Sequence, residues 1–445
     1  MKKIEKFFCS IILVLLAGTF LWLAYANHVL NSGGAAQPSP TENAQNSVPP
    51  AESAAAPAET ENEGNVKLAF CGDVVCHIGL NAQAKKSDGT YDFTPIFSSA
   101  SEVLSRADYA SVTMETTFPE KADYSGFPEF KSPPALASGL KNIGIDLVNT
   151  ASNHCMDDHQ SGLIRTLDVL DRDGLDHVGT YRTQAERDKN SGILMKEING
   201  VRIAFLSYTY GTNGLPVTHC EYAANILFKD YMSTDMENLD YAFLDRDMAA
   251  ARALKADVTV VLVHWGLEYH TQPVDYQKTL ADYFFRQGAD VVIGGHCHVP
   301  EPMELHSVTD PDGNKKTVFL AYCLGNFVSC QNDRDTDLTA ILNIDIEKNH
   351  KTGKASLKNV SYVPMFMADL NDYGIKASWR YRLLNLEDTL AAYKKGDNMG
   401  FINTQMYGAM EQGLRDLRGI LGADFDIADN GGTDVGKWTA EHAGD

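Results

Sequence analysis

The stretch from Val291 to His298, VVIGGHCH, constrains the fold more than any other part of the chain. Its β-branched residues predict a short buried strand, and the two glycines after them permit close backbone approach or a positive φ. In extended backbone, side chains two residues apart point to the same face, so we expect His296 and His298 to face one way and Cys297 the other. Two neighbouring neutral imidazoles are typical of a metal site, although hydrogen-bonded loop histidines fit the same stretch.

The composition indicates a globular protein with a large core. The chain has 445 residues, of which 44% are hydrophobic and 22% are charged. Its formal net charge of -21 argues against a nucleic-acid partner, because nucleic-acid-binding surfaces are basic. An anionic ligand stays compatible with this charge, since bound metal ions can supply positive charge locally.

Residues 1–30 are predicted to be a membrane anchor or signal segment. The run from Phe7 to Tyr25 carries no charge, and a helix of that length spans about 28 Å, close to a bilayer core. Lysines precede it and favour a body on the extracytoplasmic side. We therefore expect a single-pass protein of the cell membrane. A secreted protein is the alternative, because Ala24-Tyr25-Ala26 matches a cleavage site.

Residues 31–64 are predicted to be a disordered linker, because Ala, Pro, Ser, Asn and Glu dominate and almost no large apolar side chain is present. The main folded domain is expected over 65–365 and a helical extension over 366–445. The cysteines after the anchor lie largely on or beside predicted core strands. Buried free thiols are therefore expected, although an oxidising compartment would also permit disulfides.

Polar side chains follow the predicted strands of the main domain. Strands over 66–71, 109–114, 145–149, 257–263 and 290–293 alternate with helices, which predicts an α/β sheet. The loops at the carboxyl ends of such strands meet at one edge. Further strands over 338–346 and 358–365 are expected to form a second sheet. The polar residues that follow the first set of strands are Asp73, Glu115, Asn153, His154, His264, His296 and His298.

These residue types suit a centre with two divalent ions, such as manganese, iron or zinc. Two ions can hold a phosphoryl group and activate a bridging water. His154 would then be free to act as the general acid for the leaving group. Four further residues are expected to contact the substrate or the ligands, and these are His77, Asp157, Glu268 and Asn326. The alternative is a set of unrelated caps and turn residues.

Six motifs in order carry a resemblance to a known family. They are Gly72-Asp73, Met114-Glu115, Ser152-Asn153-His154-x-x-Asp157, His264-Trp265-Gly266-x-Glu268, Gly295-His296-x-His298 and Leu324-Gly325-Asn326-Phe327. Over about residues 66–364 the chain resembles the poly-γ-glutamate capsule synthesis proteins of CapA type, whose domain is similar to calcineurin-like metallophosphoesterases. The resemblance implies an α/β/β/α sandwich outside the membrane.

The resemblance also implies the ligand sets of the two ions. Glu115 would bridge them; Asn153, His264 and His296 would serve one ion, and Asp73 and His298 the other. The chain departs from the phosphoesterase pattern Asp-x-His, because Val75 stands where the histidine is expected. His77 is a candidate replacement.

The implied function is metal-dependent hydrolysis of a phosphoester in an extracellular polymer or its lipid carrier, alongside other capsule-synthesis membrane proteins. Two alternatives stay open. One is a non-catalytic component that holds or exports an anionic envelope polymer such as poly-γ-glutamate. The other is an amide hydrolase that cuts that polymer.

Overall fold

The computed structural model describes residues 64–443, except residue 234 and the side chains of 429 and 430. The anchor predicted over 1–30 and nearly all of the linker predicted over 31–64 lie outside this range. Among the described residues, no helix is both long enough and apolar enough to cross a membrane.

The larger β-sheet has the strand order β14-β13-β12-β1-β2-β3-β4, with β11 paired to β1 and β15 paired to β13. Strands β1 to β4 run parallel, whereas β12, β13 and β14 run antiparallel to their neighbours. The strands are β1 (Asn65–Val74), β2 (Tyr109–Met114), β3 (Leu147–Asn149), β4 (Asp176–Val178), β11 (Asn326–Val328), β12 (Leu338–Lys348), β13 (Ala355–Asp369), β14 (Tyr381–Asn385) and β15 (Thr433–Asp434).

The second sheet has the order β5-β6-β7-β8-β10-β9. Its four inner strands are parallel, and an antiparallel strand closes each edge. The strands are β5 (Leu194–Ile198), β6 (Val201–Thr209), β7 (Val258–His264), β8 (Val291–Gly295), β9 (Pro300–Thr309) and β10 (Lys315–Leu324).

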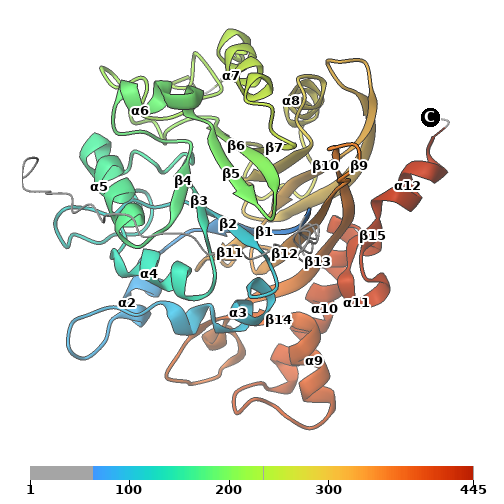
Figure 1. The fold of residues 1–445 in the computed structure, drawn as a ribbon. Helices are drawn as coiled ribbons and strands as arrows, with labels where there is room; N and C mark the ends of the chain where they lie inside the picture. The colour runs from blue at the N-terminus through green and yellow to red at the C-terminus, as the bar shows by residue number, and fades with distance from the viewer. Residues whose placement is uncertain (1–63, 234, 444–445) are drawn as a thin grey trace, which may run out of the picture. The chain divides into compact units, whose positions relative to one another are not determined.

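Helices cover the outer faces of the two sheets and one side of the sandwich (Figure 1). Helix α7 starts at Tyr241, where the Asp240 side chain caps it by accepting a hydrogen bond from the Phe243 N–H. The helices are α2 (Ile78–Ala84), α3 (Ser98–Leu104), α4 (Ala135–Asn142), α5 (His159–Arg172), α6 (Gln184–Asp188), α7 (Tyr241–Ala253), α8 (Asp275–Arg286), α9 (Leu386–Lys394), α10 (Thr404–Leu421), α11 (Ile427–Asn430) and α12 (Val435–Glu441), with 3-10 turns at Thr94–Ile96, Lys189–Gly192, Leu370–Tyr373 and Ala423–Phe425.

Strand alternation builds the layers. In β1, Leu68 and Phe70 join the core between the sheets, whereas Ala69 and Cys71 face the helices on the outer side of the larger sheet. In the second sheet, Val260 faces the shared core, and its neighbour Val261 packs with residues of α7 and α8. Because both strands are apolar on both faces, each must be covered on both sides. The result is the layered α/β arrangement that the sequence predicts.

The expectation that the strands after residue 338 form a second sheet is wrong. Strand β12 pairs directly with β1, so it and β13 extend the sheet that begins the domain. The second sheet is built from the middle of the chain instead. The reason is that a strand's apolar pattern specifies its buried faces and not its partner strand.

The C-terminal region packs against the sheets. Buried residues of α10, such as Met406 and Leu417, belong to the same core as the strands between the sheets. The domain boundary predicted between residues 365 and 366 falls inside β13, and β14 then pairs with β13. The region after residue 366 therefore contributes both strands and helices.

All seven cysteines that the structure describes are free thiols, and all but Cys330 are buried. The prediction of buried free thiols is confirmed for this part of the chain. Cys297 and Cys323 pack together with Val299 beneath the turn that carries His296 and His298. They act there as small apolar side chains.

Candidate metal centre

Two carboxylates and one histidine lie together at the carboxyl ends of strands from both sheets. Asp73 is near the end of β1, Glu115 directly follows β2, and His298 follows β8. Their ligand atoms all lie within 4.8 Å of one another, and all three side chains are buried. Among the described residues, Asp73 Oδ1 and both Glu115 oxygens have no hydrogen-bond partner. Buried polar atoms are rarely left in this state unless a missing ion or water satisfies them.

The electrostatics of this pair favour a bound cation. Burial raises the pKa of Asp73 to about 7. Burial, and secondly the nearby Asp73 carboxylate, raise the pKa of Glu115 well above its usual range. Two carboxylates without a counter-charge are unfavourable in a buried site, and a divalent cation between them removes that cost. The residues present therefore fit a metal ion.

A second group of ligand atoms lies beside the first. His264, the last residue of β7, has Nε2 2.9 Å from Asn153 Oδ1 and 3.4 Å from Glu115 Oε1. The His264 and His296 rings are 4.9 Å apart between centroids. Burial, and then the other histidines, lower the pKa of His264 and His296 well below the usual value. Both rings are therefore neutral near pH 7, as metal ligands must be.

The turn after β8 differs from the extended backbone predicted for it. The strand ends at Gly295, and His296 and His298 have φ values of 91° and 62°. Both histidines still reach the site, but through a turn in the left-handed region rather than through strand alternation. The His296 N–H donates to Asp73 Oδ2 at 2.7 Å, which joins this turn to β1. A Cβ on Gly295 would lie 2.5 Å from Asp73 Oδ1, so only glycine fits there.

His298 is oriented by a neighbour from β11. Its Nδ1 lies 3.0 Å from Asn326 Oδ1, so Nδ1 donates and Nε2 is available as a ligand. Burial lowers the pKa of His298 to about 4. Asn326 therefore orients the His298 ring within the candidate site.

His154 and Asp157 form a pair next to the carboxylate cluster. His154 Nδ1 lies 2.7 Å from Asp157 Oδ2, and both side chains are buried. The Phe130 N–H donates to the same Asp157 oxygen at 2.6 Å, and Asn213 donates to the other at 3.3 Å. Asp157 thus orients the ring and leaves Nε2 as the free ring nitrogen of His154.

His77 is not among the residues whose ligand atoms cluster in the described part of the chain. Its Nδ1 lies 3.1 Å from the Val75 carbonyl oxygen and 3.4 Å from the Cys330 amide nitrogen, and its ring packs on Phe130. Val75, at the position where the phosphoesterase pattern has a histidine, is fully buried and apolar. Glu268 lies at the rim, with Oε1 3.8 Å from His298 Nε2.

Tyr210 and Asn213 also lie at this site, and neither was predicted from the sequence. The Tyr210 ring lies 4.4 Å from the His296 ring between centroids, and Asn213 contacts Asp157. Both follow β6, whose carboxyl end lies beside that of β7. The end of β6 beside the end of β7 could have indicated these residues. The loop that contains them has no periodic sequence pattern, so nothing within the loop itself pointed to the site.

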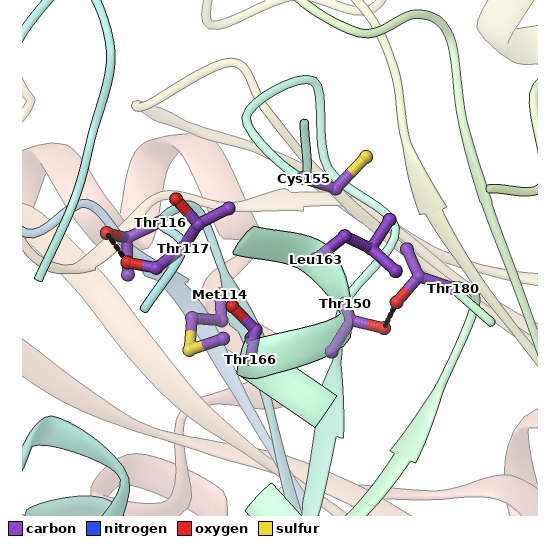
Figure 2. A pocket seen from close by; sticks show the side chains of 8 residues that line it. All are labelled: Met114, Thr116, Thr117, Thr150, Cys155, Leu163, Thr166 and Thr180. Carbon is purple, nitrogen blue, oxygen red and sulfur yellow. Dashed lines mark hydrogen bonds between the residues drawn. The ribbon is translucent and has the colours of Figure 1, made fainter. Parts of the chain in front are cut away.

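A small cavity adjoins the site without including any of the predicted ligands (Figure 2). It lies between the ends of β2 and β3 and helix α5, and a hydrogen bond between the Thr150 and Thr180 hydroxyls closes one side. Its lining contains no charged group, so it offers no catalytic chemistry of its own.

The model of the family "Bacterial capsule synthesis protein PGA_cap" matches residues 67–331. The chain belongs to this family. The "PGA biosynthesis protein CapA" of Bacillus subtilis is 27% identical over 297 residues, which cover 65% of this chain and 70% of that protein. The "Capsule biosynthesis protein CapA" of Bacillus anthracis is 26% identical over 305 residues, covering 66% and 67%. The resemblance predicted from the six motifs is confirmed.

Solved structures give more distant likenesses. A hypothetical protein of Thermus thermophilus has a TM-score of 0.36 and 15% identity, covering 67% of this chain and 98% of that one. The sulfate thiohydrolase SoxB of Thermus thermophilus has a TM-score of 0.33 and 12% identity, covering 72% and 46%. Likenesses this distant say nothing about the chemistry of the site.

Proposed function

We propose that this family member is a phosphoester hydrolase that depends on two divalent metal ions and acts in the synthesis of a capsule or envelope polymer. The observation that carries the proposal is the set of buried ligand atoms without partners among the described residues. These atoms are Asp73 Oδ1, both Glu115 oxygens, and the Nδ1 atoms of His264 and His296. A site of carboxylates, an amide and neutral imidazoles suits manganese, iron or zinc.

Glu115 lies between the two halves of this set. Asn153, His264 and His296 would hold one ion with it, and Asp73 and His298 would hold the other. Divalent ions bound there supply positive charge for a phosphoryl group and lower the pKa of water. A local cation would also offset the repulsion between an anionic substrate and a chain with a net charge of -21.

His154 would act as the general acid for the leaving group. Asp157 holds its Nδ1, so a proton delivered to the substrate would leave from Nε2. The Phe130 N–H and Asn213 hold Asp157 in turn, which fixes the ring before a substrate arrives. Such fixed orientation reduces the entropy lost in the reaction.

The substrate would be a phosphoester of an anionic envelope polymer or of its carrier. The names of the two Bacillus relatives, which refer to PGA and capsule biosynthesis, support this process. We further propose that residues 1–30 anchor the protein in the cell membrane with its body on the extracytoplasmic side, beside other capsule-synthesis membrane proteins. An uncharged run preceded by lysines supports this placement.

The test combines metal content with hydrolysis of bis-p-nitrophenyl phosphate by the purified full-length protein. We expect about two ions per chain. His296→Ala should lose metal, whereas His154→Ala should keep it and lose about 10²- to 10⁴-fold in turnover. His306→Ala is the matched control. His306 lies on β9 and pairs with Glu304, so this variant should change neither the metal content nor the turnover.

Three outcomes would contradict the proposal. A folded protein that binds no metal after loading with manganese, iron and zinc would leave the holding of an anionic polymer as the better account. Metal binding with cleavage of γ-glutamyl amides, but not of phosphoesters, would identify an amide hydrolase. Unchanged turnover in His154→Ala would remove the general acid from the mechanism.

A further inference from the structure

Glu268 lies beside His298 at the rim of the candidate metal centre. Its Oε1 is 3.8 Å from His298 Nε2, the nitrogen that Asn326 leaves free. Two atoms that each bind one ion at about 2.1 Å lie no more than about 4.2 Å apart. The spacing between Glu268 and His298 is therefore compatible with a shared ion.

The half of the centre that contains His298 is short of ligands. In the described part of the chain, the clustered ligand atoms belong to Asp73, Glu115 and His298. Glu268 lies outside this cluster as it stands, and its exposed side chain would have to turn inward to join it. Val75 supplies no ligand atom, and His77 directs Nδ1 at backbone atoms of Val75 and Cys330. A fourth protein ligand would have to come from the open side, where Glu268 lies.

The backbone around Glu268 is fixed against the turn of His296 and His298. Gly266 has φ of +92°, and a Cβ there would lie 2.5 Å from Cys297 Sγ. The Tyr269 N–H donates to the Cys297 carbonyl at 2.8 Å, and the Tyr269 hydroxyl accepts from Gln331 at 3.0 Å. The Glu268 side chain itself is 44% exposed, so its carboxylate can turn toward an ion without repacking the core.

Glu268 is also close enough to act electrostatically on the buried carboxylates. Its negative charge contributes to raising the pKa of Glu115. A third carboxylate directed at this pocket would be unfavourable without a cation, and favourable with one. Glu268 thus lies within electrostatic range of Glu115, as a ligand of the same ion would.

We propose that Glu268 is the fourth protein ligand of the ion held by Asp73, Glu115 and His298, and that the two halves of the centre therefore select different metals. This rests on the proposed metal-dependent function. One half, with Asp73, Glu115, Glu268 and His298, has three carboxylates. The other, with Asn153, His264 and His296 beside Glu115, is rich in imidazole. Carboxylates suit manganese or magnesium, and imidazoles suit zinc, so the centre binds one zinc and one manganese ion.

The test uses full-length protein stripped of metal, loaded with one equivalent of Zn²⁺ and titrated with Mn²⁺. Bound manganese is followed by electron paramagnetic resonance, and bound zinc by elemental analysis. We expect one ion of each metal in the wild type. Glu268→Gln should keep the zinc and weaken manganese binding at least about tenfold. Glu268→Asp should give an intermediate affinity. Glu197→Gln, at an exposed carboxylate on β5, is the matched control and should bind both metals as the wild type does.

The outcomes separate this inference from the function on which it rests. Manganese binding of normal strength in a folded Glu268→Gln variant would overturn the role of Glu268 and leave the dinuclear hydrolase standing. If the wild type holds two zinc ions and manganese displaces neither, the two halves of the centre do not differ in metal preference. Absence of any bound metal in the wild type would overturn both the inference and the proposed function.

Discussion

Replacing Asp157 tests how the site controls His154. The carboxylate is buried, with Oδ2 2.6 Å from the Phe130 N–H and 2.7 Å from His154 Nδ1, and Oδ1 3.3 Å from Asn213 Nδ2. Asparagine has one acceptor oxygen instead of two. If that oxygen takes the place of Oδ2, both inner contacts survive, but the bond to His154 becomes a neutral one.

The magnitude follows from these contacts. Hydrogen bonds to a charged group contribute about 1.5–3 kcal/mol and neutral ones about 0.5–1.5 kcal/mol, so Asp157→Asn loses about 1–1.5 kcal/mol. That difference corresponds to about a tenfold fall in kcat. Asp157→Ala leaves both the Phe130 N–H and His154 without this partner. We expect a loss of about 2–4 kcal/mol, or about 30- to 1000-fold in kcat.

The assay is hydrolysis of bis-p-nitrophenyl phosphate, with metal content measured on the same samples. Both variants should keep their metal, because Asp157 is not in the predicted ligand set. If the two residues act as a unit, combining Asp157→Ala with His154→Ala should lower the rate of hydrolysis no further than His154→Ala alone. Urea unfolding of each variant separates a loss of catalysis from a loss of fold.

Three results would refute this reasoning. Asp157→Ala with wild-type kcat would show that His154 does not depend on the carboxylate for its orientation. A double variant that is much slower than His154→Ala would show that Asp157 acts separately from the histidine. Loss of metal in Asp157→Asn would place the carboxylate in the metal centre instead.

Two further predictions concern the fold. Gly294→Ala would put a Cβ 1.9 Å from the Tyr322 carbonyl oxygen and should abolish soluble expression; normal folding of this variant would contradict the packing described. Gly408→Ala, in open space on α10, is the control and should raise the free energy of unfolding, measured in urea, by up to about 1 kcal/mol. Arg187→Met removes the nearer guanidinium of the buried Asp247 and leaves Arg246 Nε at 3.5 Å, so it should cost up to about 3–5 kcal/mol at neutral pH. Burial raises the pKa of Asp247 and Arg187 lowers it, so removing Arg187 should raise this pKa further. The cost should therefore shrink as the pH falls and the carboxyl group is protonated in the folded state; a cost independent of pH in urea unfolding would contradict this.

The sequence specified the site more fully than the sheet that holds it. Asp73, Glu115 and His264 could be placed because each follows a strongly apolar strand, and parallel strands bring their carboxyl ends to one edge. The partner of β12 could not be placed, because its apolar pattern fits a position in either sheet. Pairing across the whole chain decides that question, and no local signal reports it.

His296 and His298, which follow β8, were predicted correctly as site residues, but the structural reason for the prediction was wrong. Alternation in an extended strand suggested that His296 and His298 share a face, yet both have positive φ in a turn. The hydrogen bond from the His296 N–H to Asp73 stabilises that turn, and it joins residues that are 223 positions apart in the sequence. Tyr210 was missed for a related reason. Its place beside His296 depends on the neighbouring strands β6 and β7, which the sequence of its own loop does not indicate.

The candidate centre draws its residues from both sheets of the sandwich, with Asp73 and Glu115 on one and His264 and His296 on the other. An ion bound among them would add a cross-link between two sheets that already meet through apolar side chains and a few polar contacts, such as the one from the His296 N–H to Asp73. The supply of metal would then affect the stability of the fold as well as the turnover. A ligand at 100 times its Kd raises the free energy of unfolding by about 2.7 kcal/mol. A chain starved of metal would become an easier target for proteases at this edge, so the cell would clear the inactive form faster than the loaded one.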